Sequence, residues 1–177
     1  WYTSTNFSAV ERYSNSADMP PGQPFVTAIR TVSPGSFSIA QGVELNQLGN
    51  NSQFYVGSTW TLSFWAKGDP DTDVRVTAQF ADTAAGGSSP VLLFDQTGGT
   101  DLVAQNTWKK LSYTFTIDKT AQATNTGLFV YIRATTTNQK FMVTGAQLEP
   151  GNVSTPYEFV TLQTQLANCQ RYFLPEY

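Results

Sequence analysis

The chain has 177 residues, of which 40% are hydrophobic and 14% aromatic, while only 13% are charged. These values suit one globular domain whose surface is built largely from uncharged Thr, Ser, Asn and Gln. The net charge is −3 and the ten basic residues are scattered. Because a protein that neutralises phosphates needs clustered Lys and Arg, we expect no nucleic-acid partner.

The sequence contains no histidine and a single cysteine, Cys169. This excludes Ser-His-Asp, Cys-His and His-ligated zinc sites, and it leaves no internal disulfide. No apolar run approaches the ~20 residues that span a bilayer, so we expect no membrane insertion. Because the chain begins at Trp1 rather than Met, we expect it to be a fragment of a longer polypeptide.

Short apolar or alternating runs follow one another along the chain, separated by Gly, Pro, Asn, Asp and Ser. In chain order, the predicted strands are Phe25–Val32, Ser36–Leu45, Thr59–Lys67, Asp73–Ala81, Val91–Asp95, Thr107–Ile117, Gly127–Ala134 and Phe141–Glu149. About eight strands without an intervening helical pattern predict an all-β fold, an antiparallel sandwich or barrel.

Period-two alternation supports these strands individually. The apolar positions that alternation directs into a core are Trp60, Leu62, Phe64 and Ala66, then Val74, Val76, Ala78 and Phe80, then Leu111, Tyr113, Phe115 and Ile117. No helical spacing explains these three runs as well.

One helix is predicted near the C-terminus, where Leu162, Leu166, Cys169 and Phe173 follow one another by four, three and four. We therefore divide the chain into a sandwich domain over residues 1–160 and a short helical segment with a tail over 161–177. Such a short helix must dock to be stable, either on the sandwich as a lid or on symmetry mates in a trimer. The candidate subunit contacts are Leu162, Leu166 and Phe173.

Four segments occur in an order that resembles a known family: "SFSIAQGVE", "TWTLSFWAKG", "NTWKKLSYTFTI" and "VTGAQLEPGNVSTPYEFVTLQTQLANCQRYF". The last is the most specific, with a Gln-Leu-Glu strand end, Pro-Gly, a Thr-Pro-Tyr-Glu turn and a closing Cys-Gln-Arg-Tyr. This series is similar to the carbohydrate-binding-module-like jelly-roll domains of bacteriophage tail fibres and other virion structural proteins. The resemblance extends from about Phe25 to Phe173.

The resemblance implies a jelly-roll sandwich and a non-catalytic role in the virion, in assembly or in host recognition as part of a receptor-binding fibre. It further implies that the partners are other virion proteins, with self-association as a homotrimer, and that the protein is extracellular after release. A host-surface glycan is the expected ligand if the domain binds one. Two alternatives remain: a purely structural head-fibre, baseplate or adaptor component, and a carbohydrate-binding module attached to an enzyme.

Sugar recognition requires flat aromatic faces and planar polar groups, and strand alternation indicates where these lie. If the strands share a sheet, one outer face carries Trp65, Arg75, Gln79, Phe129, Tyr131 and Arg133. Half-buried aromatics also pack under loops or against a neighbouring subunit. Either arginine alone is also able to form an ordinary surface salt bridge.

A weak calcium candidate lies at Asp69, Asp71 and Asp73, which alternate as the first ligands of a calcium loop do. The pattern then breaks, because Val74 stands where that loop needs glycine and Phe80 where it needs a bidentate glutamate. An acidic hairpin loop is the simpler interpretation, and we expect neither a metal nor another cofactor.

Catalytic carboxylate pairs are recognised by a separation in space that a sequence does not reveal. The acids Glu44, Glu149 and Glu158 lie at strand ends or in turns, and nothing in the sequence marks them as a pair. We therefore expect no enzymatic activity.

Overall fold

The computed structural model describes residues 2–3, 9–13, 18–21, 23, 28–33, 37–45, 53–69, 71–82, 89–96, 101–134 and 139–157. Within these ranges the chain forms eleven β-strands and no α-helix. The strands are β1 (Tyr2–Thr3), β2 (Ala9–Tyr13), β3 (Ala28–Ser33), β4 (Phe37–Glu44), β5 (Thr59–Asp69), β6 (Thr72–Ala81), β7 (Val91–Asp95), β8 (Asp101–Val103), β9 (Lys109–Thr116), β10 (Gly127–Ala134) and β11 (Gln139–Pro150).

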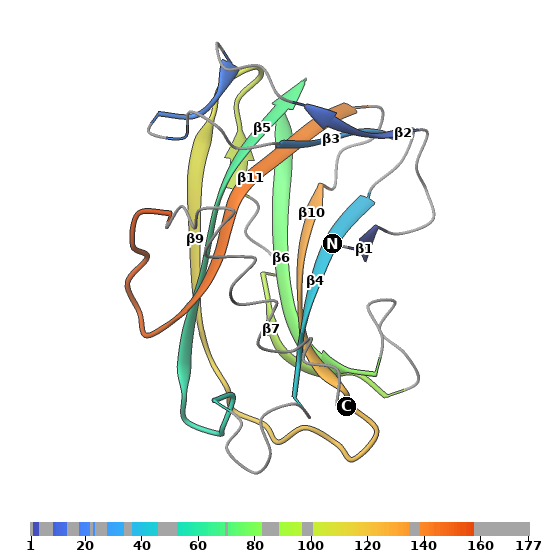
Figure 1. The fold of residues 1–177 in the computed structure, drawn as a ribbon, viewed down its shortest axis with the longest axis vertical. Helices are drawn as coiled ribbons and strands as arrows, with labels where there is room; N and C mark the ends of the chain where they lie inside the picture. Colours follow the sequence, from blue (N-terminus) through green and yellow to red (C-terminus); the bar gives the residue numbers. More distant parts are fainter. Residues whose placement is uncertain are drawn as a thin grey trace, which may run out of the picture.

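The strands form two antiparallel sheets that pack face to face (Figure 1). Sheet A has the order β1-β4-β10-β6-β7, and β8 also pairs with β6. Sheet B has the order β2-β3-β11-β5-β9. Strands distant in the sequence, such as β4 and β10, are neighbours, as in Greek-key sandwiches. The predicted all-β, antiparallel jelly-roll sandwich is confirmed.

The core lies between the two sheets and contains the residues that alternation predicted. All twelve predicted core positions on β5, β6, β9 and the residue after β9 are buried. Leu128, Val130 and Ile132 of β10 and Ile39 of β4 join the β6 residues on the core side of sheet A, opposite those of β5 and β9 in sheet B. Because alternate residues of a strand point to opposite faces, β6 and β9 also present polar side chains outward.

Strand β11 keeps its apolar side chains in the core by means of a bulge. Its register against β5 shifts by one residue between Thr144 and Gln147, and Gly145 adopts a φ of +59°. A one-residue shift exchanges the two faces of a strand. The core-facing positions therefore change from odd numbers (Phe141, Val143) to even numbers (Ala146, Leu148), while Gln147 and Glu149 face outward.

A polar network joins the two sheets at the edge where β9 meets β8. The Asp101 carboxylate accepts hydrogen bonds from the Tyr113 hydroxyl at 2.7 Å, from Lys109 Nζ at 3.3 Å and from Gln96 Nε2 at 3.3 Å. The Tyr113 hydrogen bond and the other donors lower the pKa of Asp101 despite its partial burial. Burial and the Asp101 carboxylate raise the pKa of Tyr113.

The structure adds three short strands that were not predicted, β1, β2 and β8. The predicted helix with Leu162, Leu166 and Phe173, and hence the 161–177 segment, lies outside the described residues. Among the residues that are described, no helix is long and apolar enough to cross a membrane.

Candidate functional site

The outer face of sheet A gathers five of the six predicted ligand-binding residues. Register pairs Arg133 with Arg75, Tyr131 with Thr77 and Phe129 with Gln79 across β10 and β6. On the other side of β10, the same residues pair with Ser38, Ala40 and Gly42 of β4. Their neighbours along each strand face the core, so these side chains share one surface. We call this surface outer face A, and it also includes Asp95 of β7, which pairs with Thr77.

Arg75 is fixed on outer face A by a bidentate ion pair with Asp95. Its Nε donates to Asp95 Oδ1 at 2.8 Å and its Nη2 to Oδ2 at 2.5 Å. Thr77 Oγ1 lies 3.5 Å from the same carboxylate. The hydrogen bond from Arg75 to Asp95 raises the pKa of Arg75 further above its usual value. Arg75 and Asp95 therefore neutralise each other.

Tyr131 lies at the centre of outer face A and is only 4% exposed. Its hydroxyl accepts a hydrogen bond from Gln79 Nε2 at 3.1 Å, and the Arg133 guanidinium lies 5.3 Å from the ring centroid. Burial raises the pKa of Tyr131, although Gln79 and Arg133 oppose this. Because Tyr131 is covered, it positions Gln79 and Arg133 rather than offering a free ring.

Phe129 is the more accessible aromatic residue of outer face A, and it lies over two glycines. A Cβ atom at Gly42 would come within 2.5 Å of Phe129 Cε1, and one at Gly127 within 3.0 Å of Cε2. Glycine in a strand interior often marks such a close approach. The ring thus lies across the backbone of β4 and β10, half-buried.

Arg133 differs from Arg75 because it has no carboxylate partner among the residues that the structure describes. Its Nε is buried without a hydrogen-bond partner. Its one contact of note is the Tyr131 ring.

The prediction that Trp65 shares this face is wrong. Trp65 belongs to β5, and β5 is in sheet B, where it pairs with Thr144 and Lys110. The half-buried indole lies near Gly145, whose position in the bulge makes room for it. Alternation identified the outward direction of Trp65 correctly, but it carries no information about which strands are neighbours.

The outer surface of sheet B, which we call outer face B, is crossed by the 151–157 segment that follows β11 (Figure 1). Gly151 N donates to Thr59 O at 2.8 Å, and Thr61 Oγ1 donates to Gly151 O at 2.7 Å. Lys110 Nζ donates to Thr155 O at 3.3 Å. The segment is therefore held on β5 and β9, and the buried state of Thr61 follows from this.

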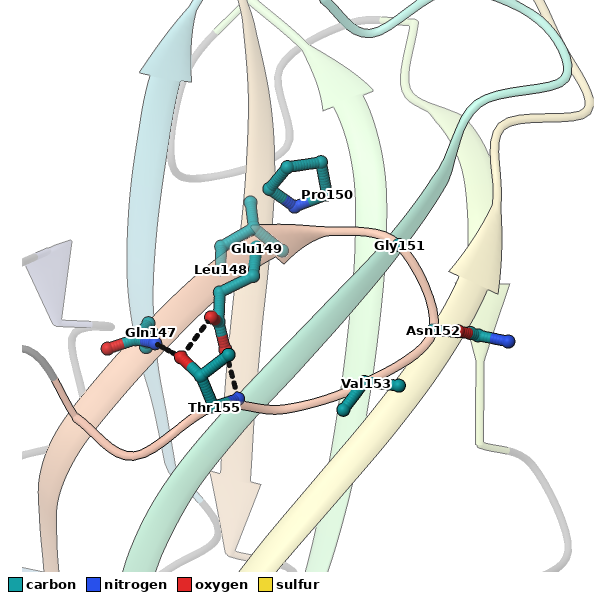
Figure 2. Close-up of a pocket in the computed structure, with 8 residues that line it drawn as sticks. All are labelled: Gln147, Leu148, Glu149, Pro150, Gly151, Asn152, Val153 and Thr155. Carbon is teal, nitrogen blue, oxygen red and sulfur yellow. Dashed lines mark hydrogen bonds between the residues drawn. The ribbon is translucent and has the colours of Figure 1, made fainter.

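Figure 2 shows a pocket of about 690 Å³ between β11 and this segment. It is lined by Gln147, Leu148, Glu149, Pro150, Gly151, Asn152, Val153 and Thr155. The Glu149 carboxylate accepts from Thr155 Oγ1 at 2.5 Å and from Thr155 N at 3.0 Å. Gln147 Nε2 donates to the same hydroxyl at 3.0 Å. The most polar groups of the pocket are thus bonded to each other, which favours a structural role.

Glu149, one of the three acids that the sequence places at strand ends or in turns, is one of these bonded groups. Burial tends to raise its pKa, but hydrogen bonds from Thr155 and Gln147 and the charge of Lys110 lower the pKa overall. A general acid needs the opposite shift, toward neutral pH. Of the other two acids considered, Glu158 lies outside the described residues, as does the side chain of Glu44.

The calcium candidate receives no support from the geometry. Asp71 Oδ1 accepts a hydrogen bond from Gln105 N, and Asp69 Oδ1 accepts one from Gln105 Nε2, both at 2.7 Å. Within the described parts of the chain, no three acidic, Cys or His side chains gather as a metal would require. Asp69 and Asp71 instead attach the Gln105 loop to the hairpin between β5 and β6.

Sequence reasoning missed Asp95 and the two glycines beneath Phe129. Asp95 was predicted only as the end of a strand, because the sequence does not show that β7 lies beside β6. The glycines carried a usable signal, since Gly42 interrupts an otherwise regular strand between Phe37 and Glu44.

A family model described as a carbohydrate binding domain matches residues 30–139, more than half of the chain. The chain belongs to this carbohydrate binding domain family. Domains of this family are normally non-catalytic, and membership supports a carbohydrate-binding function. A search of the curated proteins found no match.

Solved structures confirm the fold of the carbohydrate binding domain. The CBM22-1 xylan-binding domain of Paenibacillus barcinonensis Xyn10C is 13% identical with a TM-score of 0.50, over 85% of this chain and 86% of that one. Tailspike protein 4 of bacteriophage CBA120 is 14% identical with a TM-score of 0.51, over 85% of this chain and 19% of that one. The CBM22-1-GH10 modules of Clostridium thermocellum Xyn10B are 10% identical with a TM-score of 0.50, over 86% and 26%.

Proposed function

We propose that this protein is a non-catalytic carbohydrate-binding module and that outer face A holds the glycan. The observation that carries the proposal is the strand register, which places Phe129, Gln79, Tyr131 and Arg133 on one surface of a member of this family. Outer face B is a poorer candidate because the 151–157 segment crosses it and bonds Thr61, Lys110, Gln147 and Glu149.

Each of these side chains has a distinct part in binding a sugar. The half-buried Phe129 ring contacts the apolar face of a pyranose. The planar amide of Gln79 and the guanidinium of Arg133 bond hydroxyl groups, because both offer fixed donors. Tyr131 positions Gln79 through the 3.1 Å hydrogen bond. The ion pair between Arg75 and Asp95 keeps the neighbouring part of the face rigid.

We further propose that the module is part of a bacteriophage fibre or related virion protein and recognises a host-surface glycan. This rests on the resemblance of the "QLEPGNVSTPYE" region, with the fold shared with a phage tailspike as weaker support. In this context the protein acts as a trimer in the virion, beside other virion proteins. Light scattering of the purified chain tests the trimer, and a monomeric mass contradicts it.

The second candidate is a carbohydrate-binding module within a glycan-degrading enzyme. The observation in its favour is that one structure with the same fold is the xylan-binding domain of Xyn10C and another belongs to the endo-1,4-β-D-xylanase Xyn10B. Binding of the purified chain to xylan and to bacterial surface polysaccharides distinguishes the two contexts, because each predicts only one of these ligands.

A glycan array with variants of outer face A tests the proposed site. We expect Phe129→Ala and Gln79→Ala to reduce glycan binding at least tenfold, because each removes a group that contacts the sugar. Tyr131→Phe keeps the ring and removes only the hydroxyl that positions Gln79, so a smaller loss is expected. Melting temperatures must accompany each measurement, since a misfolded variant also loses binding.

Trp65→Ala serves as the matched control because it removes an aromatic residue from the opposite sheet. We expect it to leave glycan binding unchanged. Binding that is lost with Trp65 and retained without Phe129 contradicts the assignment to outer face A. The absence of binding to any glycan contradicts the proposed function itself.

A further inference from the structure

We propose that outer face A selects an acidic oligosaccharide and that Arg133 is the residue that recognises its carboxylate. This inference rests on the proposed function and specifies its substrate class. The ligand class is an oligosaccharide that contains a sugar acid, such as a uronic or sialic acid.

The argument starts from two arginines that lie opposite each other but differ in their partners. Arg75 and Arg133 pair in register across β6 and β10. Arg75 is bound through two nitrogens by Asp95, so its charge is already neutralised. No second carboxylate of the described chain reaches Arg133. Among the described side chains on outer face A, the charge that lacks a counter-ion is therefore the positive charge of Arg133.

Arg133 is also incompletely hydrogen bonded. Its Nε is shielded from solvent and has no acceptor. Guanidinium groups carry five N–H donors, and none of those on Arg133 bonds another residue that the structure describes. The Tyr131 ring at 5.3 Å stabilises the cation without accepting its hydrogen bonds in the plane. Burying a charged donor without an acceptor is unfavourable, and an anionic ligand relieves that cost.

The geometry of the group favours a carboxylate over other anions. A planar guanidinium matches a carboxylate or a phosphate through two parallel hydrogen bonds. Because Asp95 pairs with Arg75, Arg133 offers a single unpaired positive charge, which a singly charged carboxylate matches and a doubly charged phosphate does not. Sulfate esters are the remaining singly charged rival, and the experiment includes them.

The positions of Arg133 and Phe129 set the size of the ligand. They are four residues apart on one face of β10, which corresponds to about 13 Å along a strand. This is longer than one pyranose ring. A glycan that contacts both therefore has at least two sugar units, with the acid at the Arg133 end and a neutral unit over Phe129.

The test measures binding to acidic oligosaccharides, each paired with a counterpart whose carboxyl group has been reduced to a hydroxymethyl group. Uronic and sialic acids are both included, as are sulfated oligosaccharides. We expect at least one carboxylate glycan to bind at least tenfold more tightly than its reduced counterpart and its sulfated analogue. Arg133→Gln should remove this preference, because it should weaken binding of the carboxylate glycan at least tenfold more than binding of its reduced counterpart. Arg133→Lys should retain part of the preference for the carboxylate glycan, because lysine keeps the positive charge but lacks the planar guanidinium.

Lys140→Gln is the matched control, because it removes the same charge from an exposed position in sheet B. It should leave the preference intact. Equal binding of carboxylate and reduced glycans by the unaltered protein overturns the inference but leaves the proposed function standing, whereas binding of no glycan overturns both. A preference that survives Arg133→Gln, or an equally tight sulfated glycan, also overturns it. Should Arg133→Gln not fold, the unaltered protein and Arg133→Lys still decide the question.

Discussion

The two outer faces of this sandwich are both polar, but they differ in whether their polar groups already have partners. On outer face B, Lys67 is only 5% exposed, and its Nζ lies 2.5 Å from Asp18 Oδ1 and 5.9 Å from the Trp108 ring centroid. The segment after β11 bonds four more polar side chains of this face, those of Thr61, Lys110, Gln147 and Glu149. Two buried oxygens, Thr144 Oγ1 and Gln23 Oε1 beside Gly145, have no hydrogen-bond partner there, but both belong to neutral groups.

Outer face A has an accessible aromatic ring and a charged group without a counter-ion among the described residues. This difference between the two faces shows that polarity alone does not identify a binding surface in a sandwich. Hydrogen bonds that the fold has already formed leave little for a ligand to gain. A surface with unpaired donors offers that gain, which is why outer face A is the better candidate.

The largest expected effect follows from removing the buried charge on outer face B. Lys67→Met leaves the Asp18 carboxylate without this partner, and breaking a buried ion pair costs about 3–5 kcal/mol. Because the Asp18 side chain is 32% exposed, we expect a smaller loss, about 2–3 kcal/mol in the free energy of unfolding. Urea unfolding followed by tryptophan fluorescence measures it. Lys140→Met, at an exposed site, should change stability by less than about 0.5 kcal/mol, and equal losses contradict the prediction.

The next effect concerns the close approach beneath Phe129 on outer face A. In Gly42→Ala the new methyl group would lie 2.5 Å from Phe129 Cε1, so the ring must move. Overpacking of this kind costs about 1–3 kcal/mol. The free energy of unfolding, measured by chemical denaturation, should decrease. Glycan binding should also weaken, because the displaced ring no longer offers the same surface.

A double variant identifies the cause of that effect. Phe129→Ala in the Gly42→Ala background should restore part of the lost stability, because the methyl group then has room. If the two substitutions are strictly additive in free energy, the contact between Gly42 and Phe129 is not the cause.

The sequence was sufficient to predict most of the fold, because the alternation of Trp60 to Ala66 and of Val74 to Phe80 is a local property of each strand. The same alternation placed Arg75, Gln79, Phe129, Tyr131 and Arg133 outward. Sheet membership depends on pairings between distant segments, and no local pattern encodes these. This is why Trp65 was assigned to the wrong sheet.

The partners of the predicted site residues were also beyond sequence reasoning. The ion pair of Arg75 with Asp95 joins residues 20 positions apart, and the hydrogen bond of Gln79 with Tyr131 spans 52. The sequence placed Glu149 at a strand end, but it did not show that the turn after β11 brings Thr155 against its carboxylate. Only the three-dimensional register shows which polar groups are already bonded.

A smaller effect is expected from the hydroxyl that holds the 151–157 segment on outer face B. Thr155→Val removes a group that bonds both Glu149 and Gln147. Because Thr155 is exposed, we expect a loss of less than about 1 kcal/mol. Limited proteolysis within the segment should become faster, while Thr155→Ser, which keeps the hydroxyl, should behave like the unaltered protein. Glycan binding at outer face A should not change, and a change in both would contradict the separation of the two faces.

The smallest expected effect is the dependence of this same attachment on pH. Glu149 has a pKa below its ordinary value in the folded protein, so its charged form is favoured by folding. The stability that it contributes is therefore fully present above the ordinary pKa of a glutamate and is lost as the pH falls through the folded value. Between about pH 5 and pH 3, the unaltered protein should lose more stability than Glu149→Gln. Because Asp101 also has a lowered pKa, both proteins lose stability over this range, and only the difference reports on Glu149. Thr155→Val should shrink that difference, since the Thr155 hydroxyl is one of the donors that favour the charged carboxylate. Parallel pH curves for the unaltered protein and Glu149→Gln would show that the carboxylate does not hold the segment in place.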